Sequence, residues 1–185
     1  MDEHRLPPEG AVGIFEQLAI GQASGTLGWV LQGYPNERID RSLVPDAVHH
    51  WGDARSRGKV PGQPVLFLQA HPRDPRWVGW GRVVEPEERW RVLGVTVRCA
   101  EVLRPALPVQ EPRSIPPALS EASATPPGHD WEFRELGHVL GLATHRERTP
   151  YLDMDARDLR LGSRDLGFLL HLQPGLRRLG RGERG

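Results

Sequence analysis

The chain has 185 residues, 38 % hydrophobic and 26 % charged, which suits one domain with short extensions. Its 24 basic and 24 acidic side chains cancel, which argues against a protein that coats DNA through a broadly basic surface. No apolar run reaches the roughly 18 residues that suggest a membrane-spanning helix. The N-terminus, MDEHRLPPEG, lacks the pattern of a signal peptide, so we expect a cytoplasmic protein. The single Cys99 cannot form an internal disulfide, and we expect it to be a buried small side chain.

The first elements in chain order are a short helix and a buried strand. Residues 1–24 are expected to form an N-terminal extension whose only pattern is a short helix within 11–20. The segment 26–35, TLGWVLQGYP, has a continuous apolar centre and predicts a buried strand closed by Gly33 and Pro35.

A helix and three strands are predicted next. Apolar residues at helical spacing indicate a helix over 40–51, with Asp40 as its N-cap. The segments 64–70 and 77–84 are typical of two strands joined by a hairpin-like loop. A third strand is predicted within 89–103, where valines alternate with polar residues.

The C-terminal half is harder to interpret. Seven prolines in 104–128 predict a long surface connection inside the domain, because proline disfavours both continuous helices and central strands. A helix is predicted over 131–142, and a turn with a final helix over 152–170. The Arg- and Gly-rich segment 171–185 is expected to be a flexible tail. Strands gathered mid-chain, without alternating helices, indicate an α+β domain over 25–170 with a curved sheet.

The order of the motifs resembles a known family. The matching pieces are Trp29 to Pro35, Asp40 to Trp51, Gly62 to Ala70 and Gly79 to Pro86. They resemble the EVE domain of the PUA-like superfamily, which is related to YTH domains. The resemblance is closest to EVE-type modules associated with restriction systems. It implies a PUA-like curved mixed or antiparallel β pseudo-barrel flanked by helices. Two positions depart from the family pattern: Tyr34 stands where asparagine is common, and Gln63 where aspartate is usual.

The resemblance also implies a function in nucleic-acid binding. EVE and YTH domains are implied to hold an unpaired modified base in an aromatic-walled pocket, where stacking contributes about 1–3 kcal/mol per base. We therefore expect a non-catalytic, cofactor-free reader whose first candidate ligand is a modified cytosine in DNA, with RNA left open. The chain has no room for a nuclease as well, so a defence role would need a separate effector protein.

The resemblance places candidate base-binding residues at the exit of the first strand and around Trp51, which occupies the position of a cage tryptophan. The full set is Gln32, Gly33, Tyr34, Pro35, Trp51, Gln69, Trp77 and Trp80. An odd spacing puts Trp77 and Trp80 on opposite faces of a regular strand, so at most one of them belongs to the pocket. Alternatively, Trp51 is a core residue and Gln32 satisfies backbone groups. Trp29 is expected in the core.

Three basic residues after Trp51 are candidates for contacts with the nucleic-acid backbone: Arg55, Arg57 and Lys59. Lys59 is the only lysine of the chain. The alternative is that all three are solvated loop charges.

The run RELGHVLGLATH partly matches a zinc-protease motif. Glu135, His138 and Gly141 fit, but Arg134 and Thr144 stand where two histidine ligands are needed. One histidine of three predicts no metal site, and an ordinary amphipathic helix is the better interpretation. Three hypotheses are therefore carried forward: a modified-base reader, an adaptor that keeps the fold but has its pocket filled by its own side chains, and a zinc hydrolase.

Overall fold

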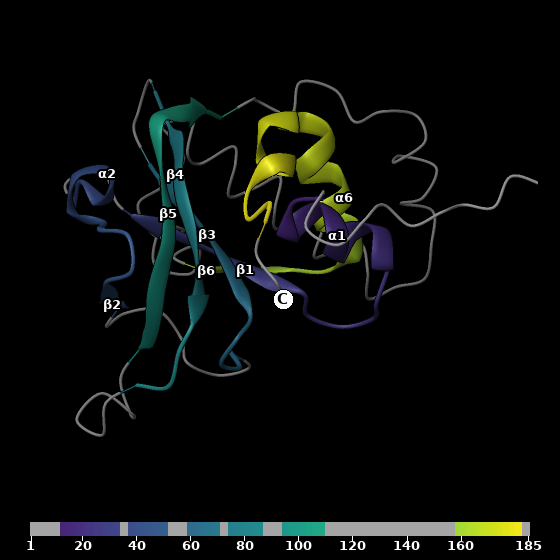
Figure 1. The fold of residues 1–185 in the computed structure, drawn as a ribbon, viewed down its shortest axis with the longest axis horizontal. Helices are drawn as coiled ribbons and strands as arrows, with labels where there is room; N and C mark the ends of the chain where they lie inside the picture. The colour runs from purple at the N-terminus through teal and green to yellow at the C-terminus, as the bar shows by residue number, and fades with distance from the viewer. Residues whose placement is uncertain are drawn as a thin grey trace, which may run out of the picture.

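The structure is a computed structural model that describes residues 12–33, 37–51, 59–70, 74–86, 94–109 and 158–182. In this part of the chain, six strands form one mixed sheet in the order β2-β5-β4-β3-β1-β6. The sheet and its helices are shown in Figure 1. In chain order the elements are α1 (Ile14–Gly21), β1 (Gly28–Gly33), α2 (Ile39–Ser42), β2 (Val48–Trp51), β3 (Pro64–Gln69), β4 (Arg76–Val83), β5 (Val95–Pro108), β6 (Asp158–Leu161), α6 (Ser163–Leu172) and the 3-10 helix η2 (Pro174–Arg178).

The predicted fold class is confirmed. β1 and β3 are parallel neighbours at the centre of the sheet, while the other neighbouring strands are antiparallel. This α+β arrangement around a mixed sheet agrees with the PUA-like architecture that the resemblance implies. Every residue of β1 and β3 is buried, which explains why both segments are continuously apolar rather than alternating. None of the described helices is long and apolar enough to cross a membrane.

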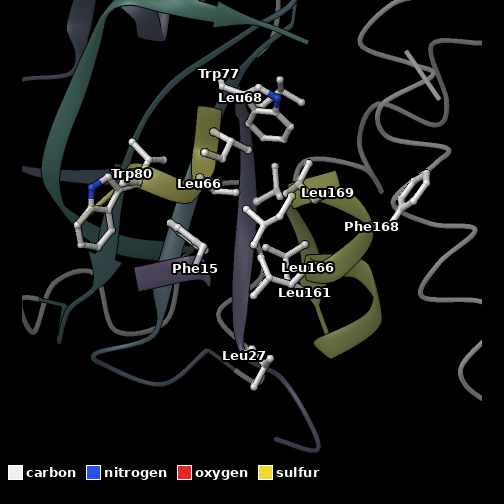
Figure 2. Close-up of a cluster of buried hydrophobic side chains, with 14 of the residues drawn as sticks. Phe15, Leu27, Leu66, Leu68, Trp77, Trp80, Leu161, Leu166, Phe168 and Leu169 are labelled. Carbon is white, nitrogen blue, oxygen red and sulfur yellow. The ribbon is translucent and has the colours of Figure 1, made fainter. Parts of the chain in front are cut away.

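Both faces of the sheet carry a hydrophobic core. The first core lies between the sheet and the helices α1, α6 and η2, and Figure 2 shows Leu66 and Leu161 of the strands beside Leu166 and Leu169 of α6. The second core lies on the opposite face and contains Trp29, as predicted. Burying apolar side chains on both faces is the main source of stability for this sheet.

The two ends of the described chain are part of the first core. The backbone N–H of Ile14, at the start of α1, donates to the carbonyl oxygen of Leu179 at 2.8 Å. A Cβ at Gly13 would overlap the carbonyl oxygen of Arg177, so the two segments are in direct contact. Leu176 and Leu179 are fully buried. The described part of the expected flexible tail, residues 171–182, is therefore folded, because its leucines cover apolar surface of α1.

The helix predicted over 40–51 is wrong beyond its first turn. α2 ends at Ser42, and the chain then forms the edge strand β2. The backbone of Asp46 and Ala47 exchanges hydrogen bonds with Cys99 of β5, at 2.8 and 2.9 Å. Pro45 also disfavours a helical conformation of the residue before it. Pairing with β5 therefore overrides the helical spacing of the apolar residues.

Two further features of the sheet differ from the sequence-based prediction. β5 extends to Pro108, through the first five residues of the segment 104–128 that was predicted to be a surface connection. β2 pairs only with Val95 to Arg98, so the later part of β5 has no described neighbour on that side and tolerates proline there. β6 was not predicted; it pairs antiparallel with β1. The rest of the predicted connection and the helix over 131–142 lie outside the described residues.

Candidate functional site

Trp51, the predicted cage residue, is a core residue. It is the last residue of β2, only 5 % exposed, and its ring stacks on Phe67 with centroids 5.4 Å apart and planes 5° apart. Both rings belong to the second core. One face of the indole is therefore covered by Phe67, a side chain of the protein itself, which agrees with the alternative interpretation of Trp51.

Trp77 and Trp80 are also core residues, and they lie on the same face rather than on opposite faces. Opposite Phe67 and Leu68 of β3, strand β4 has one extra residue, because Leu68 pairs with Trp77 and Phe67 pairs with Gly79. This β-bulge at Val78 shifts the alternation by one residue, so both tryptophans point into the first core. Neither forms a wall of an open pocket.

The exit of β1 holds Gln32 and Gly33, with Gln69 of β3 paired opposite Gly33. Gln69 uses its amide locally: its Oε1 accepts from the backbone N–H of Asp40 at 3.4 Å, and its Nε2 donates to the carbonyl oxygen of Ala70 at 2.9 Å. Gln32 is 3 % exposed, and its buried Oε1 has no hydrogen-bond partner among the described residues. Tyr34 and Pro35 lie outside the described residues.

The strand register places the predicted pocket residues at different strand ends. Gly33 is aligned with Gln69 and Arg76 at one end of the sheet. Trp51 is aligned with Val95 at the other end, where β3 and β5 begin and β4 finishes. The stack of Trp51 on Phe67, two residues before Gln69 in β3, bridges part of this separation.

Lys59 is buried, in contrast to the expected loop charge. Its side chain is 1 % exposed, its ammonium forms an ion pair with Asp158, and the Nζ atom lies 4.0 Å from the centroid of the Trp29 ring. The indole N–H of Trp29 donates to Oε1 of Gln63 at 2.8 Å, and the same oxygen accepts from the backbone N–H of Val60 at 2.8 Å. Gln63, the unusual residue in the family pattern, thus holds the Lys59 segment against β1. Arg55 and Arg57 lie outside the described residues.

A pocket of about 570 Å³ opens beside Lys59, at the sheet end that carries Trp51. It lies between the segment after Lys59 and the ends of β4 and β5. Its lining residues are Lys59, Pro61, Val83, Val84, Glu85, Pro86, Gly94, Val95 and Thr96. The hydroxyl of Thr96 is hydrogen-bonded to Nδ1 of His50 at 3.0 Å. Its walls combine valine and proline side chains with the polar groups of Lys59, Glu85 and Thr96, and such a mixture is found in sites for small organic molecules or bases.

Most of these lining residues were missed by sequence reasoning. Glu85 and Thr96 lie on different strand ends, and nothing local marks them as neighbours. One signal was available: Val83 to Pro86 form the end of the last segment that matches the EVE pattern.

Among the described residues, one carboxyl and one thiol group have shifted pKa values, and neither lines the pocket. The hydrogen bond from Arg38 lowers the pKa of Asp40. Burial, with a smaller effect from the charge of Asp46, raises the pKa of Cys99 to about 11. A thiol that stays protonated at neutral pH is not a nucleophile. Among the described residues no group of three His, Cys, Asp or Glu side chains could hold a metal ion. The zinc-like run around His138 lies outside them.

Comparison with known proteins assigns the chain to no family. No protein-family model matches it, and no curated protein matches it. A hypothetical protein from Leishmania major is similar in structure, with 12 % sequence identity, a TM-score of 0.42, and coverage of 82 % of this chain and 96 % of that one. The human THYN1 protein, solved in complex with 5-methylcytosine-containing DNA, is similar with 12 % identity and a TM-score of 0.40, over 78 % of this chain and 96 % of that one.

Proposed function

We propose that the protein is a non-catalytic nucleic-acid-binding module that holds one modified base in the pocket beside Lys59. The observation that carries the proposal is this pocket of about 570 Å³, whose walls combine valine and proline side chains with the polar groups of Lys59, Glu85 and Thr96. Its volume is within the range of about 300–1,000 Å³ that is usual for small-ligand sites. The EVE-like order of sequence motifs supports the same function and makes modified cytosine in DNA the first candidate ligand.

The valine and proline side chains of the lining suit a methylated base. Val83 and Val95 belong to strands, and Pro61 and Pro86 are rigid, so this surface is held in place before a ligand binds. A methyl group transferred from water to such a surface gains about 0.8 kcal/mol. This is a modest preference, so we expect methylation to tighten binding by a factor of a few rather than to create it.

The proposal is tested by filling the pocket. Val84 is half-buried in the lining, and Pro61 lies in an exposed turn, so Val84→Trp and Pro61→Trp would occupy the pocket from two sides. Val44→Trp is the matched control, because Val44 is 54 % exposed and lies outside the lining. Binding is measured by fluorescence anisotropy with single- and double-stranded oligonucleotides carrying one cytosine, 5-methylcytosine or 5-hydroxymethylcytosine.

We expect wild type and Val44→Trp to bind the modified oligonucleotides, and both pocket variants to bind at least about tenfold more weakly. Equal affinity for all three cytosines, unchanged in the pocket variants, contradicts the proposal. In the cell, the reader would act in the cytoplasm and pass its signal to a separate effector protein, such as a nuclease.

A second function, an adaptor without base reading, is favoured by one observation. One face of the predicted cage residue Trp51 is covered by Phe67, a side chain of the protein itself. If wild type binds none of the oligonucleotides while remaining folded, the adaptor is the better account.

A further inference from the structure

The charges around the pocket restrict the kind of ligand that fits. Among the described lining residues Lys59 is the only basic one, and its ammonium forms an ion pair with Asp158. Glu85 is the only acidic one among them. The described charges at the pocket therefore include one carboxylate without a described counter-charge. That carboxylate disfavours a phosphate or carboxylate group beside it and favours a neutral group with hydrogen-bond donors.

Lys59 does not become available as a positive charge when a ligand enters the pocket. Its side chain is 1 % exposed and is held between the Asp158 carboxylate and the face of the Trp29 ring. Turning the ammonium away from Asp158 would leave a carboxylate that is 10 % exposed without its partner, which is costly in a buried site. Lys59 thus acts as a fixed part of the wall.

Glu85 has the opposite character. It is exposed at the pocket rim, and within the described part of the chain no ion pair engages its carboxylate. A carboxylate accepts hydrogen bonds only, so its natural partner is an N–H group. Among the bases, an exocyclic amino group supplies such donors, and a glutamate that accepts from the amino group of cytosine is an established mode of base readout.

We propose that Glu85 is a specificity-determining residue of this pocket, accepting a hydrogen bond from the exocyclic amino group of the bound base. This inference rests on the proposed function. A base with an amino group, such as cytosine, gives the carboxylate a donor. Thymine and uracil present a carbonyl oxygen at the corresponding position, which a carboxylate repels. The pocket therefore selects amino bases over keto bases, whatever further preference the methyl group adds.

The test compares cytosine with thymine at one position of otherwise identical oligonucleotides, and 5-methylcytosine with thymine in the same way. The last pair has the same methyl group and differs only in the amino-to-keto edge. Wild type is compared with Glu85→Gln and with Glu101→Gln, the same chemical change at an exposed residue of β5 outside the lining. Thermal melts establish that all three proteins are folded.

We expect wild type and Glu101→Gln to prefer 5-methylcytosine over thymine by about tenfold, the size expected for one good edge contact. In Glu85→Gln the amide can also donate, so the preference should disappear or reverse. An unchanged preference in Glu85→Gln overturns the inference. Equal binding of 5-methylcytosine and thymine by wild type, weakened by Val84→Trp, overturns the inference but leaves the proposed function standing. Absence of binding to every oligonucleotide overturns both.

Discussion

The indole ring of Trp51 lies parallel to the ring of Phe67, with centroids 5.4 Å apart. Trp51 ends the edge strand β2, whereas Phe67 is in β3, and β5 and β4 lie between these strands in the sheet. The stack therefore ties the edge strand to the middle of the sheet across the second core. If Trp51 is a core residue, its substitution should change the stability of the protein and not its binding of bases.

Replacing Trp51 by alanine should lower the free energy of unfolding by about 3 kcal/mol, because the change removes a buried ring and leaves a cavity. Trp51→Phe keeps an aromatic ring in the core, so it should lose less than half of the free energy of unfolding that Trp51→Ala loses. It should leave nucleic-acid binding unchanged. Urea denaturation measures the first effect and anisotropy the second. Val48→Ala, on the same strand but 50 % exposed, is the control and should change stability by less than about 0.5 kcal/mol. A folded Trp51→Phe that loses base discrimination would show that Trp51 contacts the base.

The ion pair between Lys59 and Asp158 should contribute to stability through its burial. Lys59→Met leaves the Asp158 carboxylate without its partner and should cost about 3 kcal/mol, and adding Asp158→Leu should recover most of that loss. The exposed pair Arg38–Asp40, with side chains 45 % and 29 % exposed, is the comparison. Arg38→Ala should cost much less than Lys59→Met, because water screens an exposed ion pair. A double-mutant cycle by urea denaturation measures the coupling, and additive effects of the Lys59 and Asp158 changes would argue against a coupled pair.

The two buried glutamines at the exits of β1 and β3 should respond in opposite ways to the same substitution. Gln32→Met removes a buried oxygen that has no hydrogen-bond partner in the described part of the chain and should raise the free energy of unfolding by about 1 kcal/mol. Gln69→Met breaks hydrogen bonds with Asp40 and Ala70 and should lower it by about 1–3 kcal/mol. Urea denaturation curves of the two variants and of wild type measure both changes in the free energy of unfolding. Destabilisation by Gln32→Met would mean that this oxygen has a partner in solution.

Cys99 should make stability depend on pH in alkaline solution. Burial raises the pKa of the folded thiol to about 11, from a reference value of 9.0. Between these values the unfolded chain loses the proton while the folded chain keeps it, so stability is present below about pH 9 and is lost as the pH rises towards 11. Urea midpoints of wild type and Cys99→Ala at pH 8 and pH 10 isolate this contribution. We expect the midpoint of wild type to fall more, and parallel shifts of both proteins would refute the assignment.

The parts of the fold that follow from local sequence were predictable. β3 and β4 were expected at 64–70 and 77–84 because short apolar runs are bounded by turn residues, and they are observed at Pro64–Gln69 and Arg76–Val83. The bulge at Val78 had a local signal, since a glycine inside a strand often marks a bulge. A Cβ at Gly79 would overlap the carbonyl oxygen of Glu101, which explains the glycine.

The parts that depend on distant contacts were not predictable. β6 is four residues long, half of them charged, and it forms beside β1, where Arg160 donates a hydrogen bond to Thr26, 134 residues away. Lys59 has the glycine and proline neighbours of a loop, but its partner Asp158 is 99 residues away. The pocket has the same origin: its walls come from strand ends that only the register of the sheet brings together.

The hydrogen bond from Ile14 to Leu179 has a consequence for how the protein is made. α1 is synthesised before the segment that it packs against. The carbonyl oxygen that accepts from Ile14, and the leucines that cover α1, belong to residues translated more than a hundred codons later. The first core therefore cannot close while the ribosome still holds η2. Until then α1 and the apolar strands β1 and β3 have exposed surface, which exposes the nascent chain to aggregation and makes it a client for chaperones. Folding is completed only after Leu179 has left the exit tunnel, so the proposed reader is functional only after α6 and η2 have both emerged from the ribosome.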